Sequence, residues 1–591
     1  MTANEIQLLK LLHAPRHFTI PIYQRPYSWS LEECSKLFDD ILRVGLDSTR
    51  RSYFMGAVVY YQPSAHAIGP VPESQVIDGQ QRLTTSILLL TAIYRLLKEQ
   101  GELIPAVSSE ELRVQYLINQ FKTGELAQRL LLTKRDRETM IAIVNSVPLP
   151  ANSSERVREN FAYFRRQINA DNAAGLWAGI SKLMVVGVAL EAGIDNPQLI
   201  FESLNSTGRP LDQADLIRNY VLMGQTPTAQ DALYKGYWYP MEEAFGEDYG
   251  WMFREFMRDF LTMKLGRLVG IDTVYQSFKN EYAAGCTTAA CIEELAHELY
   301  QHATYYVRLR QPEKEVHPEL RQALQQLRDF GATVAYPYLL DAYAASEKEL
   351  LSKQELGEVV HMVERYVVRR AICGIPTNTL NSTFMNFGTH LDPDNYLESV
   401  KQKFLELGYN RRFPLDDEFR EQLVNRDTYH TIRTRKHLLK HLANYQQKEY
   451  VNIDEYTVEH IMPQNENVSE AWKAELGPEW KEVHSRYLHT IGNLTLTGYN
   501  SELSDRPFSE KKTMPGGFLT SPIKLNQSVA AEPVWNMAAI LQRANLLADW
   551  AIAIWPVPVV TTSIIVSKEQ VDEQVEEEAL AEAGLFLDQE D

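Results

Sequence analysis

The stretch Val458-Glu459-His460-Ile461-Met462-Pro463-Gln464 decides how the last third of this chain is expected to fold. It predicts a short strand over residues 457–461, and a second strand is predicted at 494–496, directly after Gly492-Asn493. A long insert separates the two strands. Helices are expected from Phe508 to Lys511 and from 538 to 550. The sequence therefore predicts a strand pair followed by helices.

The same residues carry a donor set suited to a one-metal nuclease. His460 could take a proton from water, while Glu459 and Asn500 could hold a cation through the hard oxygen ligands that Mg²⁺ prefers. Asn493 would pin the loop by hydrogen bonds to the backbone. The alternative is a chance Glu-His pair on a partly exposed strand. The ordered downstream residues favour catalysis, with Glu459, His460 and Asn493 as the catalytic set.

Other histidines of this region show no repeated metal-ligand spacing. We therefore expect surface or core positions, rather than ligand roles, for His437, His441, His484 and His489.

A second polar motif, Asp78-Gly79-Gln80-Gln81-Arg82, follows a predicted strand at 75–77. Further strands are predicted at 20–23 and 53–61, and a helix is predicted from Thr84 onward. A strand, a glycine turn and a helix N-terminus form an anion site because unpaired N–H groups point outward. Arg82 adds a bidentate cationic fork, and Asp78 could hold a metal or a ribose hydroxyl. The motif therefore predicts ligand binding.

Two neighbouring segments have open interpretations. Tyr27 and Trp29 surround Arg25 with aromatic rings that suit either base stacking or core packing. The second segment is interpreted equally well as functional or as structural, with a turn followed by an ion pair on a helix. Its residues are Asn205, Gly208, Asp215 and Arg218.

The bulk properties are those of a soluble globular protein. Its 591 residues are too many for one core, so two to four domains are expected. Residues from about 100 to 410 have a helical pattern with few strand signals. No signal peptide or membrane-spanning run is predicted, which indicates a cytoplasmic protein. The four cysteines form no CxxC pair and suggest neither a zinc ribbon nor a disulfide framework.

The net charge of −19 excludes a generally basic surface but not a local basic groove. Part of the acidic excess lies after Lys568, in a run expected to be a solvated, disordered tail; a tail that mimics DNA is the weaker alternative. The basic residues around the Glu459-His460 strand have two interpretations: they bind DNA phosphates, or they form a solvated helix face. The predicted phosphate contacts are Arg433, Arg435, Lys436, Lys440, Lys511 and Lys512.

Taken together, these motifs resemble the GmrSD family. The segment from Ile20 to Trp29 and the Asp78–Arg82 motif resemble its N-terminal ParB/sulfiredoxin-like nucleotide domain, whose second motif matches 201–205 through 215–219. The segment from Glu459 through Asn500 resembles the family's C-terminal His-Me finger (HNH-type) nuclease domain. The resemblance covers nearly the whole chain except the acidic tail.

The resemblance implies an α+β, mostly helical architecture. Residues 1–230 would form a ParB/sulfiredoxin-like nucleotide-binding α/β domain with a helical extension, and 231–410 a helical linker domain. Residues 411–556 would form a ββα-metal (His-Me finger) nuclease domain, followed by the acidic tail at 557–591.

The resemblance also implies a type IV restriction enzyme of phage defence: an NTP-dependent endonuclease that cleaves modified double-stranded DNA. Implied cofactors are Mg²⁺, or another divalent cation, and a nucleoside triphosphate; no membrane partner is expected, and a homodimer is left open. The nucleotide would contact Gln24, Arg25, Asp78, Gly79, Gln80, Gln81, Arg82 and Asn205.

The sequence bears on two other activities. Sulfiredoxin chemistry is not expected because no cysteine lies beside the Asp78–Arg82 motif, and Cys34 is the nearest. The competing function is a nucleotide-gated nucleic-acid-binding or toxin-like effector that does not select modified DNA. Cleavage of modified against unmodified DNA, with and without NTP, would separate these functions.

Overall fold

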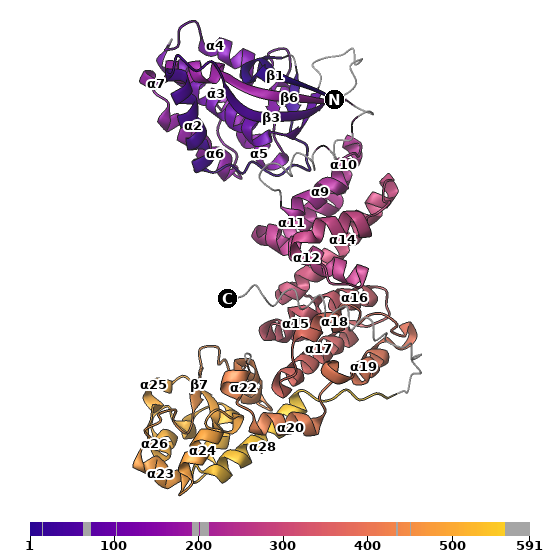
Figure 1. Cartoon of the computed structure of the whole chain (residues 1–591), viewed down its shortest axis with the longest axis vertical. Coiled ribbons are helices and arrows are strands. Elements are labelled where there is room, and N and C mark those ends of the chain that lie inside the picture. Colours follow the sequence, from indigo (N-terminus) through magenta and orange to yellow (C-terminus); the bar gives the residue numbers. More distant parts are fainter. Residues whose placement is uncertain are drawn as a thin grey trace. The chain divides into compact units, whose positions relative to one another are not determined.

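The computed structural model describes residues 1–14, 16–62, 73–101, 103–191, 195, 200, 212–432, 435–449 and 451–561. The chain divides into two compact units. Unit 1 comprises Met1–Met257 with Gly270–Gln301, and unit 2 comprises Arg258–Val269 with His302–Asp591 (Figure 1). Both units are mostly helical and both contain a sheet, which confirms the α+β, mostly helical class. Asn205, Gly208, Arg433 and the acidic tail from 562 lie outside the described residues.

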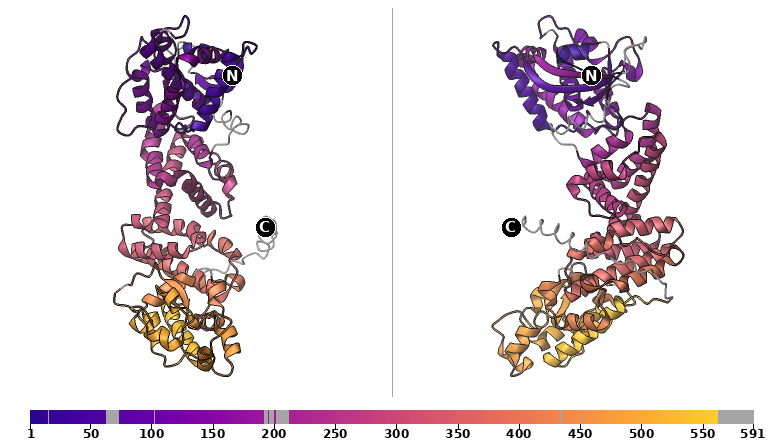
Figure 2. Two further views of the ribbon diagram at one scale, coloured as in Figure 1. Left: turned by 90° about the vertical axis from the view of Figure 1, so that its left-hand side faces the viewer. Right: turned by 45° about the vertical axis from the view of Figure 1, so that its right-hand side comes forward.

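Unit 1 is built on a mixed six-stranded sheet with the strand order β1-β6-β3-β4-β2-β5. Pairs β1/β6 and β3/β4 are antiparallel, and the other three pairs are parallel. Figure 2 shows this sheet and its helices from two further directions. The strands are β1 (Thr2–Gln7), β2 (His17–Thr19), β3 (Tyr53–Gln62), β4 (Glu73–Asp78), β5 (Leu130–Leu131) and β6 (Leu183–Glu191).

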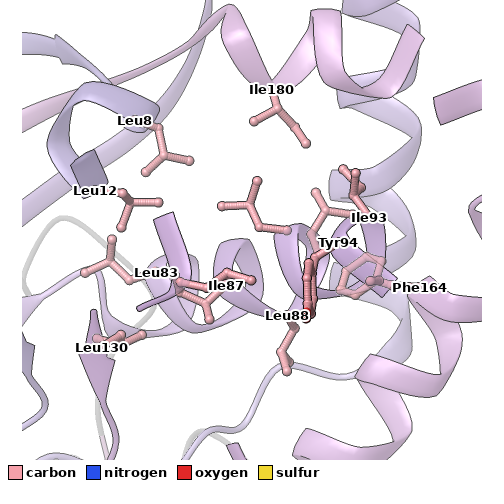
Figure 3. Close-up of a cluster of buried hydrophobic side chains, with 14 of the residues drawn as sticks. Leu8, Leu12, Leu83, Ile87, Leu88, Ile93, Tyr94, Leu130, Phe164 and Ile180 are labelled. Carbon is pink, nitrogen blue, oxygen red and sulfur yellow. The ribbon is translucent and has the colours of Figure 1, made fainter. Parts of the chain in front are cut away.

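The core of unit 1 surrounds helix α3 (Gln80–Gln100), which is buried on nearly all sides (Figure 3). Leu83, Ile87 and Tyr94 of this helix belong to one apolar cluster with Leu8 and Phe164. Burial on nearly all sides agrees with the apolar run of its middle, residues 87–90, while its charged residues lie near its two ends. The helix begins at the Asp78–Arg82 motif, so the core fixes the position of that motif.

Helices α2 (Leu31–Leu46) and α7 (Ala170–Ser181) cross at a close backbone contact. A Cβ at Gly45 would lie 1.8 Å from the carbonyl oxygen of Gly175, and a Cβ at Gly179 would lie 2.0 Å from that of Ile41. No other residue type fits such separations, so these glycines set the crossing. The remaining helices of the N-terminal half are α1 (Leu8–His13), α4 (Ser109–Leu112), α5 (Lys134–Asn145), α6 (Glu155–Gln167), α9 (Gln213–Leu222), α10 (Pro227–Leu233), α11 (Tyr239–Phe245), α12 (Tyr249–Leu265), α13 (Val274–Ser277) and α14 (Ala289–Arg310).

Several local predictions for unit 1 need correction. Residues 20–23 are a turn rather than a strand, because Pro21 has no N–H and its carbonyl accepts from the Gln24 N–H. Helix α3 begins at Gln80 rather than Thr84. Strand β6 was missed, since a short apolar run does not distinguish a strand from a buried helix. A disulfide between Cys286 and Cys291 also departs from the expectation of none.

Unit 2 contains the two-stranded antiparallel sheet β7 (Thr457–His460) and β8 (Leu494–Thr497). The register pairs Glu459 with Thr495 and His460 with Leu494. Both strands lie close to their predicted positions. The helices are α15 (Pro318–Phe330), α16 (Tyr336–Glu347), α17 (Lys353–Cys373), α18 (Asn378–Phe384), α19 (Tyr396–Glu406), α20 (Asp416–Asn425), α21 (Thr428–Thr431), α22 (Arg435–Asn444), α23 (Glu470–Leu476), α24 (Trp480–Tyr487), α25 (Asn500–Leu503), α26 (Phe508–Thr513), α27 (Lys524–Ala530) and α28 (Met537–Ile554).

Helix α28 ties the sheet of unit 2 to its core. The guanidinium of Arg543 is buried and donates to the carbonyl oxygens of Ile491, Gly492 and Leu494. Within the described part of the chain, α28 is the one helix long and apolar enough to cross a membrane by length and composition. Core helices pass the same test, and the buried face of α28 lies in the core of unit 2.

Candidate active site

Strand β7 brings Glu459 and His460 into the interior of unit 2. Successive side chains of a strand point to opposite faces, so the two residues reach different environments. Both are nearly inaccessible to solvent, with 4% and 3% of their surfaces exposed. The Ile461 N–H still donates to the carbonyl oxygen of Asn493, the next residue in the β7–β8 register, and the pairing ends there because the Asn493 N–H donates to the carbonyl oxygen of Thr490 instead.

Asn493 holds the loop after β7, and its side chain is fully buried. Its Oδ1 accepts from the Met462 N–H at 2.8 Å and from Trp535 Nε1 at 3.1 Å. Its Nδ2 donates to the carbonyl oxygens of Met462 and Leu488. These are the backbone hydrogen bonds expected for a residue that pins the loop. Asn493 therefore positions His460 and has no exposed surface with which to touch a substrate.

His460 lies against a cluster of rings. Its Nε2 is 3.1 Å from Nδ1 of His489, and the ring centroid of Tyr429 is 4.6 Å away. The ring of His430 lies 4.3 Å from that of His489, and Nδ1 of His430 is 2.9 Å from Oδ2 of Asp427. The path from His460 through His489 and His430 leads from the interior to exposed residues, since His430 is exposed and His489 half-buried.

The electrostatics keep His460 neutral. Burial, with the nearby His489 and Lys511, lowers the pKa of His460 to about 3. Burial also lowers the pKa of His489, and His430 adds to that shift. Nδ1 of His460 is buried and has no hydrogen-bond partner among the described residues. A neutral imidazole with an unused nitrogen has the lone pair that a general base needs, but a pKa this far below 7 makes His460 a weak base as the residues stand, and a bound anion would have to raise it.

His489, His430, Tyr429 and Asp427 were missed as site residues. They reach His460 because Asp427 and Thr490 form a β-bridge and the Thr428 N–H donates to the carbonyl oxygen of His489. Their segments lie about 30 residues from His460 in either direction, and no periodic pattern links them. The one local signal in the sequence is that Asp427 lies three residues before His430. This is the spacing of a helix N-cap, and it predicts that the two residues contact each other.

Glu459 forms a buried ion pair with Lys511. Nζ of Lys511 lies 2.7 Å from Oε1 of Glu459 and also donates to the carbonyl oxygens of His460 and Ile461. Burial raises the pKa of Glu459 and lowers that of Lys511, and the pair opposes both shifts. Lys511 is fully buried, so this structure does not present it to DNA phosphates as the sequence suggested.

The predicted cation ligands do not fit a bound ion as they stand. The Glu459 carboxylate is buried and already neutralised by Lys511. Asn500 is half-buried, and its Nδ2 donates to the carbonyl oxygen of Val458 and to Thr457 Oγ1, which leaves Oδ1 as a donor to a cation. One amide oxygen is too few for Mg²⁺ without water or substrate oxygens.

The predicted basic cluster separates into different surroundings. Arg435 lies over the ring of Tyr429, 4.7 Å from its centroid, next to the His460 cluster. Lys436 and Lys440 both bind Asp454, through its carbonyl oxygen and its carboxylate. Lys512 donates to the carbonyl oxygen of Glu532. Among the predicted phosphate contacts that are described and not fully buried, Arg435 is therefore the one that packs against the His460 cluster, through Tyr429.

In unit 1, the Asp78–Arg82 motif forms a tight turn from strand into helix. Gly79 has φ of 92°, and a Cβ there would lie 2.9 Å from the carbonyl oxygen of Ala57, so glycine is required. Arg82 Nη2 donates to Oδ2 of Asp78 at 3.0 Å and to Ala57 O at 2.7 Å. Arg82 Nε is buried with no hydrogen-bond partner in the described part of the chain. The motif thus keeps an unsatisfied cationic donor at a helix start.

Two of the three glutamines of the predicted site, Gln24 and Gln81, hold the upstream loop, in which Arg25 is half-buried. Gln24 Nε2 donates to the carbonyl oxygen of Ile77, and Gln81 Oε1 accepts from the Ser28 N–H. Gln80 is buried at the helix start. Tyr27 is buried and hydrogen-bonded to Thr85, and Trp29 packs against the same core. The structure therefore places both aromatic rings in packing roles.

Two further residues of unit 1 have structural roles. Arg218 is buried and paired with Asp215 and Glu242, and its Nε donates to the carbonyl oxygen of Tyr23. This matches the helix ion pair considered for Asp215 and Arg218. Cys34 is also buried, and burial raises the pKa of its thiol to about 11. A protonated, inaccessible thiol does not suit sulfiredoxin chemistry.

Two family models match this chain. The GmrSD restriction endonuclease N-terminal domain matches residues 8–222, and the GmrSD restriction endonuclease C-terminal domain matches residues 413–550. No curated protein matches the chain. The first match contains the Asp78–Arg82 motif, and the second contains the His460 cluster. Because the two matches together cover more than half of the 591 residues, the chain belongs to the GmrSD restriction endonuclease family, and its role is that of a restriction endonuclease acting on DNA.

Proposed function

We propose that this protein is an NTP-dependent endonuclease that cleaves modified phage DNA, with a His-Me finger nuclease centre at His460 and a ParB/sulfiredoxin-like nucleotide site at Asp78–Arg82. The observation that supports the nuclease centre best is the environment of His460. Its imidazole is neutral, one nitrogen faces His489, and the other is unpartnered among the described residues.

The proposed reaction is hydrolysis of a phosphodiester. His460 takes a proton from water, the water oxygen adds to phosphorus, the bond from phosphorus to the leaving oxygen breaks, and that oxygen takes up a proton from solvent while His460 returns its proton to solvent. His489 orients His460 and would pass the proton that His460 takes up on toward the exposed His430. Lys511, which neutralises Glu459 and fixes the backbone of His460 and Ile461, keeps the strand end rigid.

A divalent cation at Glu459 and Asn500 is part of the proposal, but no step is assigned to it. Glu459 would first have to release Lys511. Cleavage measured with Mg²⁺, with excess chelator, and after Mg²⁺ is restored tests the requirement. Cleavage that persists in chelator would show that the protein's own groups suffice.

The decisive experiment compares cleavage of modified phage DNA with cleavage of unmodified DNA of the same sequence, with and without NTP. Cleavage confined to modified DNA and dependent on NTP supports the proposal. Equal cleavage of both DNAs would favour the nucleotide-gated, toxin-like effector instead.

Replacing Arg82 by alanine is expected to weaken nucleotide binding about tenfold or more, because a charge-assisted hydrogen bond contributes about 1.5–3 kcal/mol. Arg82→Lys should lose less, since it keeps the charge without the fork. The nucleotide would replace Asp78 as partner of the guanidinium. Calorimetric titration with NTPs measures the effect, and the exposed Arg158→Ala is the matched control. Unchanged affinity in Arg82→Ala would move the nucleotide site elsewhere.

Reversing the charge of Arg435 with Arg435→Glu is expected to weaken binding to modified and unmodified DNA alike. Each lost phosphate contact lowers the slope of log affinity against log salt by about one. Lys436→Glu is the matched control, because Lys436 is bound to the Asp454 carbonyl oxygen. Gel-shift titrations over a salt series measure both slopes. Equal slopes for wild type and Arg435→Glu would assign Arg435 to packing on Tyr429.

A further inference from the structure

A second cluster of histidines in unit 2 surrounds the buried carboxylate of Glu364. The residues of this cluster come from helices α17 and α22. Glu364 and His361 come from α17, and His437 and His441 come from α22. A cavity of about 170 Å³ opens beside them, lined by Gln326, His361, Glu364, Arg365, His441, Ile554 and Trp555. None of these residues contributes to the ring cluster around His460 described above.

The donor atoms converge. One ligand atom each of Glu364, His437 and His441 lies within 4.8 Å of the other two. Nε2 of His437 is 3.2 Å from Oε1 of Glu364. Ligand atoms around a tetrahedral zinc ion are separated by about 3.3 Å, given Zn–N distances near 2.0–2.1 Å. Small side-chain adjustments would therefore bring all three donors to one ion.

The local geometry explains this convergence. His437 and His441 are four residues apart, so they lie on one face of α22, and their ring centroids are 4.4 Å apart. His361 and Glu364 are three residues apart on α17, with Nδ1 of His361 3.7 Å from Oε2 of Glu364. Trp555 Nε1 donates to Oε1 of Glu364 at 3.3 Å. Hydrogen bonds of this kind, from residues that do not touch the metal, orient a metal ligand.

The charge of Glu364 is the second argument. Its ion-pair partners among the described residues are His361 and His437, with no lysine or arginine. Glu364 is buried, with 3% of its surface exposed. A buried carboxylate that is not ion-paired with a lysine or arginine of the described residues is costly, and a bound metal ion would supply the matching charge.

His441 is available as a ligand. Its ring lines the cavity, and one of its nitrogens belongs to the three converging ligand atoms. Two imidazole nitrogens and one carboxylate oxygen suit zinc better than magnesium, which prefers oxygen ligands.

We propose that Glu364, His437 and His441 hold a resident zinc ion, with a water from the adjoining cavity as the fourth ligand. The ion would join α17 to α22, the helix that precedes the His460 strand. It would stabilise unit 2 and is separate from any cation of the nuclease reaction.

The test measures metal in the untagged full-length protein by mass spectrometry after exposure to zinc and desalting. Wild type should keep about one zinc per chain, and Glu364→Gln and His441→Ala should each lose it. The exposed His317→Ala is the matched control and should keep zinc. Asn500→Ala should also keep it, which separates this site from the proposed nuclease cation. Wild type without zinc, or equal zinc in both ligand variants, would overturn the proposal.

A second readout does not depend on the variants folding. X-ray absorption at the zinc edge of wild type should show two imidazoles and only nitrogen or oxygen ligands. Chelator should lower the melting temperature of wild type and of His317→Ala, because removal of a ligand bound to the native state destabilises it. An edge spectrum with no imidazole, or a melting temperature insensitive to chelator, would contradict the assignment.

Discussion

His460→Ala is expected to lower the rate of DNA cleavage by about 10² to 10⁴, the loss typical when a general base is removed. Nucleotide binding should be unchanged, because the Asp78–Arg82 motif belongs to unit 1 and His460 to unit 2. Cleavage of labelled DNA under single-turnover conditions measures the chemical step.

The control for this prediction is His460→Gln. Glutamine keeps much of the side-chain volume and can still hydrogen-bond to His489, but it cannot act as a base at neutral pH. Both variants should bind DNA like the wild type in gel shifts. Cleavage at the wild-type rate by either variant would remove His460 from the mechanism and leave His489 as the candidate base.

Asn493→Ala is expected to lower the free energy of unfolding of unit 2 by about 2–4 kcal/mol, because several buried polar groups lose their partner at once. The N–H of Met462, the indole N–H of Trp535 and two carbonyl groups would be left unsatisfied. Urea denaturation of the full chain measures the change, and cleavage should fall with the loss of loop order.

The matched control is Asn500→Ala. Asn500 also donates to the backbone, but it is half-buried, so water can replace its hydrogen bonds. Its removal should cost about 1 kcal/mol or less. An equal loss of stability in both variants would show that the burial of Asn493 is not the reason for its contribution to stability.

Motifs that are local in sequence were predictable. The positions of β4, β7 and β8 follow from short apolar runs, and the turn at Gly79 follows from a glycine between a strand and a helix. The loop-pinning hydrogen bonds of Asn493 also agree with expectation. Such predictions succeed because their physics depends on neighbouring residues.

Predictions that needed distant partners were incomplete or wrong. Lys511 has the sequence context of a surface cation, yet its ammonium lies beside Glu459, 52 residues away. His489 has no ligand spacing of its own and becomes part of the site through contact with His460. A charge or an imidazole has no fixed role until the fold supplies its partner.

By itself, the sequence determined the two motifs, the mostly helical class and the strand pair that carries Glu459-His460, because each depends on residue types at short spacing. Only the tertiary structure decided which groups surround His460, that Lys511 neutralises Glu459, and that Glu364 meets His437 and His441. The physical reason is that pKa values, ion pairs and metal ligation depend on burial and on separations of a few ångströms. Those separations join residues that lie 29 to 77 positions apart in the chain, and only the packing of the core sets them.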